Sequence, residues 1–336
     1  MTAQAGVQPN AKPHPGAPDM GAPGMGLRDD GADSERMCSA FGSSLPNADV
    51  RNAEEPASSA ADAGACSSAE HNASLSGMGA QNACLGAARL YDLHCHLGFF
   101  AKPNAAAREL AAAGVAALSA TVSPADYERA AAALADAPNV RVGVGLHPWL
   151  VEDGTCGEAD VARAVELAGS TRYVAEVGLD FAHGRDASAS AQLDALDRIL
   201  AACGDGDHVL SVHAVRAGTP LLDLLERHRT CTGNRVVLHW FSGTSEELGR
   251  ALRMGCLLSV GTRMLATRRG REYARQIPIE RLLLETDLPG SAAEGSGLTP
   301  AELVRQLRRA RATLCDLHGP DAPDVIAATS AELLRM

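Results

Sequence analysis

The sequence predicts an α/β protein, a TIM (β/α)₈ barrel that follows a disordered N-terminal extension. From Arg89 onward, short apolar runs alternate strictly with amphipathic segments, as expected for a parallel sheet whose strands are joined by helices. Eight such units fill roughly 245 residues, which is the size of a closed eight-stranded barrel. An open, doubly wound sheet is the alternative that the same alternation allows.

Each expected strand is a short apolar run followed by a segment of helical periodicity. The expected strands are 90–95, 115–122, 140–145, 173–177, 209–212, 236–238, 257–260 and 282–284. The expected helices lie near 105–113, 124–136, 158–168, 188–203, 218–229, 244–254, 269–276 and 299–317. These elements assign residues 89–336 to the barrel domain.

Residues 1–88 have a different composition, rich in Ala, Gly, Ser and Pro, and Phe41 is their only aromatic residue. No apolar residues repeat there at a helical or strand period. Such a segment buries too little apolar area to offset its loss of backbone entropy. We therefore expect residues 1–88 to be a disordered extension.

Composition limits the function classes. The formal net charge of −11 argues against a protein that coats nucleic acid through a basic surface. It does not exclude a nuclease, because a bound metal adds positive charge that a residue count omits. No apolar run is long enough for a membrane span, and no secretory signal is visible. Nine cysteines without a CxxC pair suggest a reducing compartment, so we expect a cytoplasmic protein.

The first expected strand ends in Asp92-Leu93-His94-Cys95-His96. Side chains alternate across a strand, so Asp92, His94 and His96 should share one face while Cys95 points away. Two imidazoles on one face can bind one metal ion through their ring nitrogens. Asp92 is expected to orient one of these histidines.

Four other strands also end in groups that can bind metal. Glu176 ends the fourth strand, His213 the fifth and His239 the sixth, and Asp287 follows the eighth. In a TIM barrel these ends converge on one mouth, and buried charges gather there at low cost only around a partner such as a divalent cation. The predicted metal ligands are His94, His96, Glu176, His213, His239 and Asp287.

These ligands are more than one tetrahedral ion needs, so one or two divalent ions are expected. His94, His96, Glu176 and Asp287 could hold one ion, and Glu176, His213 and His239 a second, with Glu176 as the bridge. Imidazole-rich ligation suits zinc, while the carboxylates also admit manganese or magnesium.

Four further residues are candidates for substrate contact. His147 could contact a phosphate or water, or could simply be a hydrogen-bonded loop residue before Pro148. Arg216 follows the fifth strand, and Arg268 and Arg269 lie in an arginine-rich loop after the seventh. A guanidinium group binds two phosphate oxygens at once. The usual explanation of such a loop, however, is a run of charged residues that face solvent.

Five blocks of this sequence resemble, in order and spacing, the signature blocks of TatD-type metal-dependent hydrolases. They are 92–96, 145–148, 175–180, 239–243 and 283–289. The amino-acid sequence of residues 239–243 and 264–271 is similar to that of short TatD-like proteins from bacterial anti-phage defence clusters of the Qat type. The resemblance implies a metal-dependent DNase or related phosphodiesterase with the six ligands above. One departure is that Arg216 stands one position later than the family's arginine.

The expected function is therefore hydrolysis of a phosphodiester, with DNA as the substrate and a water activated by metal as the nucleophile. Asp287 is the expected general base as well as a ligand. Two alternatives stay open. One is a barrel amidohydrolase or esterase that acts on a small molecule or an aminoacyl ester, since fold does not settle substrate. The other is a metal-stabilised subunit with protein partners in a defence complex.

Overall fold

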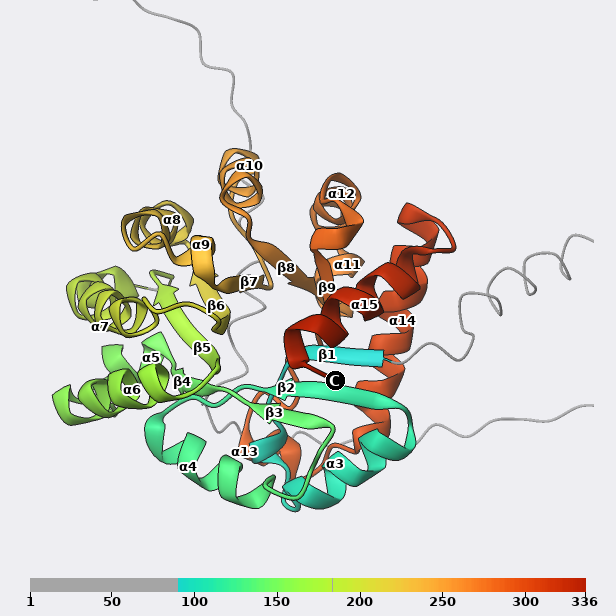
Figure 1. Ribbon diagram of the computed structural model, residues 1–336, viewed down its shortest axis with the longest axis horizontal. Coiled ribbons are helices and arrows are strands. Elements are labelled where there is room, and N and C mark those ends of the chain that lie inside the picture. The colour runs from blue at the N-terminus through green and yellow to red at the C-terminus, as the bar shows by residue number, and fades with distance from the viewer. Residues whose placement is uncertain (1–89, 183) are drawn as a thin grey trace, which may run out of the picture. The chain divides into compact units, whose positions relative to one another are not determined.

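The computed structural model describes residues 90–182 and 184–336. The extension expected at residues 1–88 lies outside these described residues. Within them, the strands form an inner ring and the helices lie outside it (Figure 1). The strands are β1 (Leu90–Cys95), β2 (Val115–Ser119), β3 (Val140–Val142), β4 (Val144–Leu146), β5 (Tyr173–Asp180), β6 (Val209–Val215), β7 (Arg235–His239), β8 (Leu257–Val260) and β9 (Leu282–Leu284).

All paired strands are parallel, in the orders β1-β2-β3 and β4-β5-β6-β7-β8-β9. Only Gly143 separates β3 from β4, so these two short strands together occupy one strand position of the barrel. The ring closes where the segment after β9 meets β1. There the Asp287 N–H donates to the His94 carbonyl (2.8 Å) and the His96 N–H donates to the Leu288 carbonyl (2.9 Å). The TIM barrel is confirmed, and the open sheet is not the fold.

The eight expected helices are present, with bounds within a few residues of those predicted. They are α3 (Pro103–Ala112), α4 (Pro124–Ala133), α6 (Glu158–Ser170), α7 (Ala189–Ala202), α8 (Gly218–Arg227), α10 (Ser245–Met254), α12 (Arg268–Gln276) and α14 (Pro300–His318). Their starts follow from local chemistry. In α10, for example, the Thr244 side chain accepts from the Glu247 N–H while the Glu247 carboxylate accepts from the Thr244 N–H.

The structure adds short elements that periodicity did not predict. They are η1 (Leu97–Phe99), α5 (Pro148–Glu152), η2 (Arg185–Ser188), α9 (Thr230–Gly233), α11 (Thr262–Ala266), η3 (Ile279–Arg281), α13 (Ala292–Gly295) and the longer α15 (Ala322–Leu334). Among the described residues, no helix is both long and apolar enough to cross a membrane.

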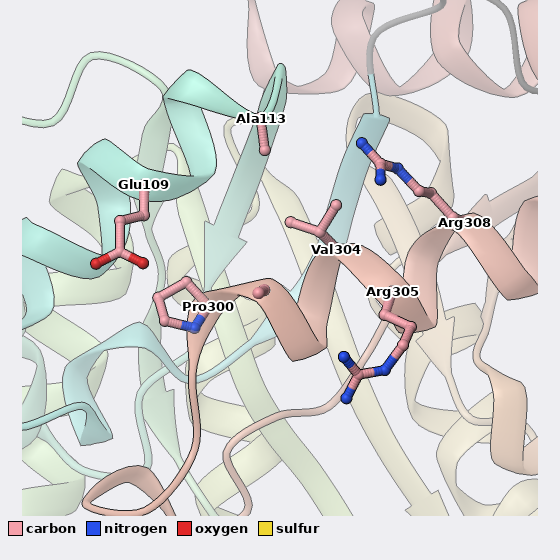
Figure 2. Close-up of a pocket in the computed structure, with 7 residues that line it drawn as sticks. Glu109, Ala113, Pro300, Val304, Arg305 and Arg308 are labelled. Carbon is pink, nitrogen blue, oxygen red and sulfur yellow. The ribbon is translucent and has the colours of Figure 1, made fainter.

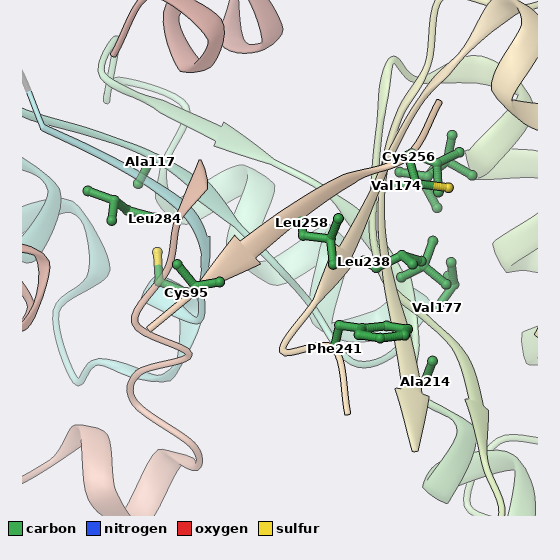
Figure 3. Close-up of a cluster of buried hydrophobic side chains, with 14 of the residues drawn as sticks. Cys95, Ala117, Val174, Val177, Ala214, Leu238, Phe241, Cys256, Leu258 and Leu284 are labelled. Carbon is green, nitrogen blue, oxygen red and sulfur yellow. The ribbon is translucent and has the colours of Figure 1, made fainter. Parts of the chain in front are cut away.

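Two apolar layers hold the barrel together. The larger lies between the strands and the outer helices, and Figure 3 shows part of it, including Val177, Leu238 and Leu258. The smaller fills the inside of the ring, where Leu333 and Leu334 of α15 pack with side chains such as Tyr91. Helix α15 therefore closes the end of the barrel at which the strands begin.

A groove of about 480 Å³ lies outside the barrel, between α3 and α14 (Figure 2). Its lining residues are Glu109, Ala113, Pro300, Ala301, Val304, Arg305 and Arg308. None of the predicted metal ligands or substrate residues contributes to it. The groove is therefore separate from the chemistry at the carboxyl ends of the strands.

Candidate metal centre

Glu176 takes its position from a distortion of β5. The register of β5 with both neighbouring strands shifts around this residue, and its φ is +70°. A bulge of this kind re-aims a side chain, and non-glycine residues adopt such a φ mainly where the surrounding structure enforces it. Two residues later, Gly178 has φ +150°, and a Cβ there would lie 2.0 Å from the His213 carbonyl oxygen. The local sequence Glu-Val-Gly thus permits a backbone that most residues could not adopt.

The two carboxylate oxygens of Glu176 face two different groups of histidines. Oε2 lies 2.6 Å from His94 Nε2 and 3.1 Å from His96 Nε2. Oε1 faces a second group of three imidazoles: His239 Nε2 at 3.3 Å, His213 Nδ1 at 3.4 Å and His147 Nε2 at 3.6 Å. Burial alone would raise the pKa of Glu176, but the neighbouring histidines hold it well below its usual value, so this group stays a carboxylate.

Asp287 completes the first group. Its Oδ1 lies 3.4 Å from His96 Nε2 and 3.9 Å from His94 Nε2. Donor atoms of His94, His96, Glu176 and Asp287 all lie within 4.8 Å of one another. The Asp287 side chain is 22% exposed, whereas the side chains of the other three are almost fully buried. Asp287 is therefore the member of this group that solvent reaches.

The second group contains a residue that the predicted ligand set did not include. Donor atoms of His147, Glu176 and His213 lie within 4.8 Å of one another. His239 belongs to the same place, because its Nε2 is 3.2 Å from His213 Nδ1. Burial lowers the pKa of His147 to about 3, so its imidazole is neutral, and its Nδ1 accepts from the Trp149 N–H (3.1 Å), which leaves the ring N–H on the Nε2 that faces Glu176. His147 was expected only as a substrate contact or loop residue.

Neighbouring polar groups fix the histidine rings. Ser211 Oγ lies 2.6 Å from His94 Nδ1, and Asp180 Oδ2 lies 3.2 Å from His213 Nε2. Asp180 also accepts from the Trp149 indole N–H at 2.6 Å. Burial opposes ionisation of Asp180, but its hydrogen bonds lower its pKa to about 2. The rings of His94 and His213 thus each turn one nitrogen toward Glu176 and the other toward a fixed partner.

Asp92 does not orient a histidine ring as expected. A register shift in β1 between Asp92 and Cys95 breaks the simple alternation on which that expectation rested. The Asp92 carboxylate instead accepts from the Thr286 N–H (3.0 Å), the Thr286 hydroxyl (2.6 Å) and the His94 N–H (3.3 Å). It therefore fixes the backbone that carries His94 and Asp287. Cys95 does face the outer apolar layer.

Glu285 is a further buried carboxyl beside the histidines, and the sequence motifs did not predict it. This carboxyl is buried, accepts from the Ser259 hydroxyl (2.5 Å) and the Trp240 N–H (3.1 Å), and lies 3.9 Å from His239 Nδ1. Burial raises its pKa well above the usual value. The signal in the sequence was its place two residues before Asp287, which puts both carboxyl groups near the mouth.

The candidate arginines differ from one another. Arg216 follows the end of β6 at φ +51° and is exposed, and Arg268 is exposed at the start of α12. Arg269 instead donates to the Gly243 carbonyl and to the Tyr273 hydroxyl (3.0 and 3.2 Å). These contacts hold Arg269 against the segment that follows β7.

The donor set fits divalent cations. Imidazoles and carboxylates converge from six different strands and the segments that follow them, and this mixture of nitrogen and oxygen donors suits zinc and neighbouring first-row ions. The Nδ1 atoms of His96 and His239 are buried without a hydrogen-bond partner among the described residues. The Nε2 atoms of both rings face Glu176, and gathering this many buried polar groups in one place is costly without a cation among them.

Comparison with known proteins identifies the family. Residues 91–335 match the family model described as "TatD related DNase". The chain belongs to the TatD family of metal-dependent hydrolases. It is 30% identical over 251 residues to the "uncharacterized metal-dependent hydrolase YjjV" of Escherichia coli (strain K12), covering 71% of this chain and 94% of that protein. It is 33% identical over 149 residues to the "3'-5' ssDNA/RNA exonuclease TatD" of Pantoea ananatis, covering 43% of this chain and 56% of that protein.

Solved structures of TatD proteins share the fold. The crystal structure of YjjV from E. coli K12 superposes with a TM-score of 0.62 at 24% identity, covering 74% of this chain and 99% of that chain. A TatD-family hydrolase from Entamoeba histolytica gives a TM-score of 0.61 at 16% identity, covering 74% and 98%. These structures share the fold, while the match to the family model and the identity to YjjV confirm the TatD resemblance seen in the sequence.

Proposed function

We propose that the barrel, residues 89–336, is a metal-dependent phosphodiesterase that hydrolyses DNA. The observation that carries the proposal is the position of Glu176, whose two oxygens face two separate groups of donors. His94, His96, Glu176 and Asp287 would hold one cation, and Glu176, His213 and His239, with His147 beside them, a second. Zinc, manganese and magnesium are the candidate ions.

Different residues of the chain would have different roles in the proposed hydrolysis. Cations bound here would polarise a phosphoryl oxygen and lower the pKa of water. Asp287, the solvent-reached carboxylate, would accept the proton of the attacking water at a carboxylate oxygen. Glu176 would hold the two positive charges together, while Ser211 and Asp180 keep His94 and His213 in place.

Two features favour a phosphate-containing substrate. Arg216 and Arg268 are exposed and follow strands whose carboxyl ends form the mouth, where they could contact substrate phosphates. The names of several relatives, such as the Pantoea exonuclease, refer to DNA or RNA. An association with a Qat-type defence complex stays a prediction from the amino-acid sequence of residues 239–243 and 264–271.

Hydrolysis assays on the full chain test this proposal. The substrates are single- and double-stranded DNA, single-stranded RNA, and a p-nitrophenyl ester, each with zinc, manganese or magnesium. We expect metal-dependent cleavage of DNA that Glu176→Gln abolishes. Cleavage of the carboxylic ester alone would favour an esterase, and no cleavage of any substrate despite bound metal would favour a subunit role.

A further inference from the structure

Two cysteines outside the metal centre form a close pair. Cys231 lies in α9, directly before β7, and Cys256 directly precedes β8. Their sulfur atoms are 3.6 Å apart, and both thiols are free. Because β7 and β8 are parallel neighbours, the pair joins the starts of two adjacent strands. It therefore lies at the end of the barrel opposite to His239.

The two thiols have unequal surroundings. Cys231 is partly exposed, whereas Cys256 is fully buried in the outer apolar layer (Figure 3). The hydrogen bond with Cys256 lowers the pKa of Cys231 against the effect of burial, and the positive charge of Arg281 adds to this. The Arg281 guanidinium donates to the Gly255 carbonyl, so it is fixed beside the pair. Cys231 is thus the accessible thiol that ionises more easily.

Other free cysteines lack this combination. Burial raises the pKa of Cys156 to about 11 and that of Cys203 to about 12. Cys95 is fully buried, and its thiol donates to the Leu118 carbonyl. A thiol reacts as its thiolate, so these three are poor nucleophiles in the folded protein.

We propose that Cys231 and Cys256 are a reversible disulfide-forming site whose oxidant is a low-molecular-weight disulfide. The Cys231 thiolate attacks one sulfur of the oxidant, forms a mixed disulfide and releases one small thiolate. The hydrogen bond with Cys231 and burial raise the pKa of Cys256, but the effect of Cys231 is removed once that residue is in the mixed disulfide. Cys256 then loses its proton, attacks the Cys231 sulfur and expels the second small thiolate. The protein loses two electrons and two protons, and the oxidant is reduced to two thiols.

The structure needs little movement to make this bond. The sulfur atoms must approach from 3.6 Å to about 2 Å, and Cys231 lies in a four-residue helix between α8 and β7. The new bond would tie the segment before β7 to the segment before β8. Closing this loop restricts the unfolded chain, so the oxidised barrel should unfold at a higher temperature.

Oxidised glutathione, thiol alkylation and tryptic peptide mapping of the full chain test the proposal. Trypsin cleaves after Arg229, Arg235, Arg253 and Arg263, so the expected product is peptide 230–235 linked to peptide 254–263. Dithiothreitol should separate the two peptides. Cys231 should be consumed at least about tenfold faster than Cys156.

Two variants test the order of the steps. Cys256→Ser should accumulate the glutathione mixed disulfide at Cys231, because the second thiol is missing. Cys156→Ser, a matched loss of one free thiol, should form the same linked peptides as the unmodified chain. Failure of the unmodified chain to link 230–235 with 254–263, or random linkage among its cysteines, would overturn the proposal without needing any variant to fold.

Discussion

Oδ2 of Asp180 lies 3.2 Å from Nε2 of His213, on the side of the imidazole that does not face Glu176. This contact determines which ring nitrogen turns toward the proposed second cation. Replacing Asp180 with Asn removes the negative charge behind the ring and should reduce metal affinity or activity by about 10–100-fold. Metal titration followed by calorimetry, together with DNA hydrolysis rates, measures the effect.

Asp186 provides the control, because it is an exposed aspartate in the nearby η2 turn. Asp186→Asn carries the same change of charge away from His213 and should behave like the unmodified protein. Equal metal affinity and equal rates in both variants would show that Asp180 does not orient His213 for metal binding.

Asp287 and Glu176 should separate proton transfer from charge bridging. Asp287→Asn should keep much of the metal, since the amide oxygen still coordinates weakly, but hydrolysis should fall by roughly 10²–10⁴-fold. Glu176→Gln should instead lower the metal stoichiometry, because a neutral amide bridges two cations poorly. Elemental analysis and single-turnover rates on both variants distinguish the two roles. Near-normal hydrolysis by metal-loaded Asp287→Asn would remove this residue as the general base.

Arg268 and Arg269 are neighbours in the sequence but should respond differently to substitution. Arg268 is exposed, so Arg268→Ala should leave stability unchanged and reduce the slope of log K against log salt for DNA binding by about one. Arg269 contacts Gly243 and Tyr273, so Arg269→Ala should lower the unfolding temperature. Arg227→Ala, on the outer helix α8, serves as a charge control. An unchanged salt slope in Arg268→Ala would show that Arg268 is an ordinary solvent-exposed residue that does not contact DNA phosphates.

Much of the fold followed from periodicity, because each barrel strand is a buried apolar run and each main helix has a regular apolar face. Helix α15 was missed because it contributes only a few apolar side chains, such as Leu333, to the inside of the ring. The proximity of the six candidate ligands was predictable because barrel topology brings strand ends together. The contacts of Glu285 and Arg269 could not, since they depend on partners far away in the sequence, Ser259 and Trp240 for Glu285 and Gly243 for Arg269.

Gly178 should be intolerant of a side chain. Gly178→Ala places a Cβ at 2.0 Å from the His213 carbonyl oxygen in a backbone with φ +150°, so the free energy of unfolding should fall by more than about 1–3 kcal/mol. Hydrolysis should fall as His213 moves. At Gly184, which has φ +82° and open space around its Cβ position, Ala should cost only about 1 kcal/mol. Denaturant titrations of both variants give the comparison, and equal losses would show that contact with His213 is not the cause.

Helix α15 and the side chains inside the ring leave the barrel without a through-passage among the described residues. A polymer therefore cannot thread along the barrel axis past the metal centre. Substrate must enter, and product must leave, through the same opening. With the proposed DNA substrate, each cleaved fragment would have to leave through this opening before the next bond could reach Asp287. Release of the product, rather than bond breaking, would then limit turnover on long strands.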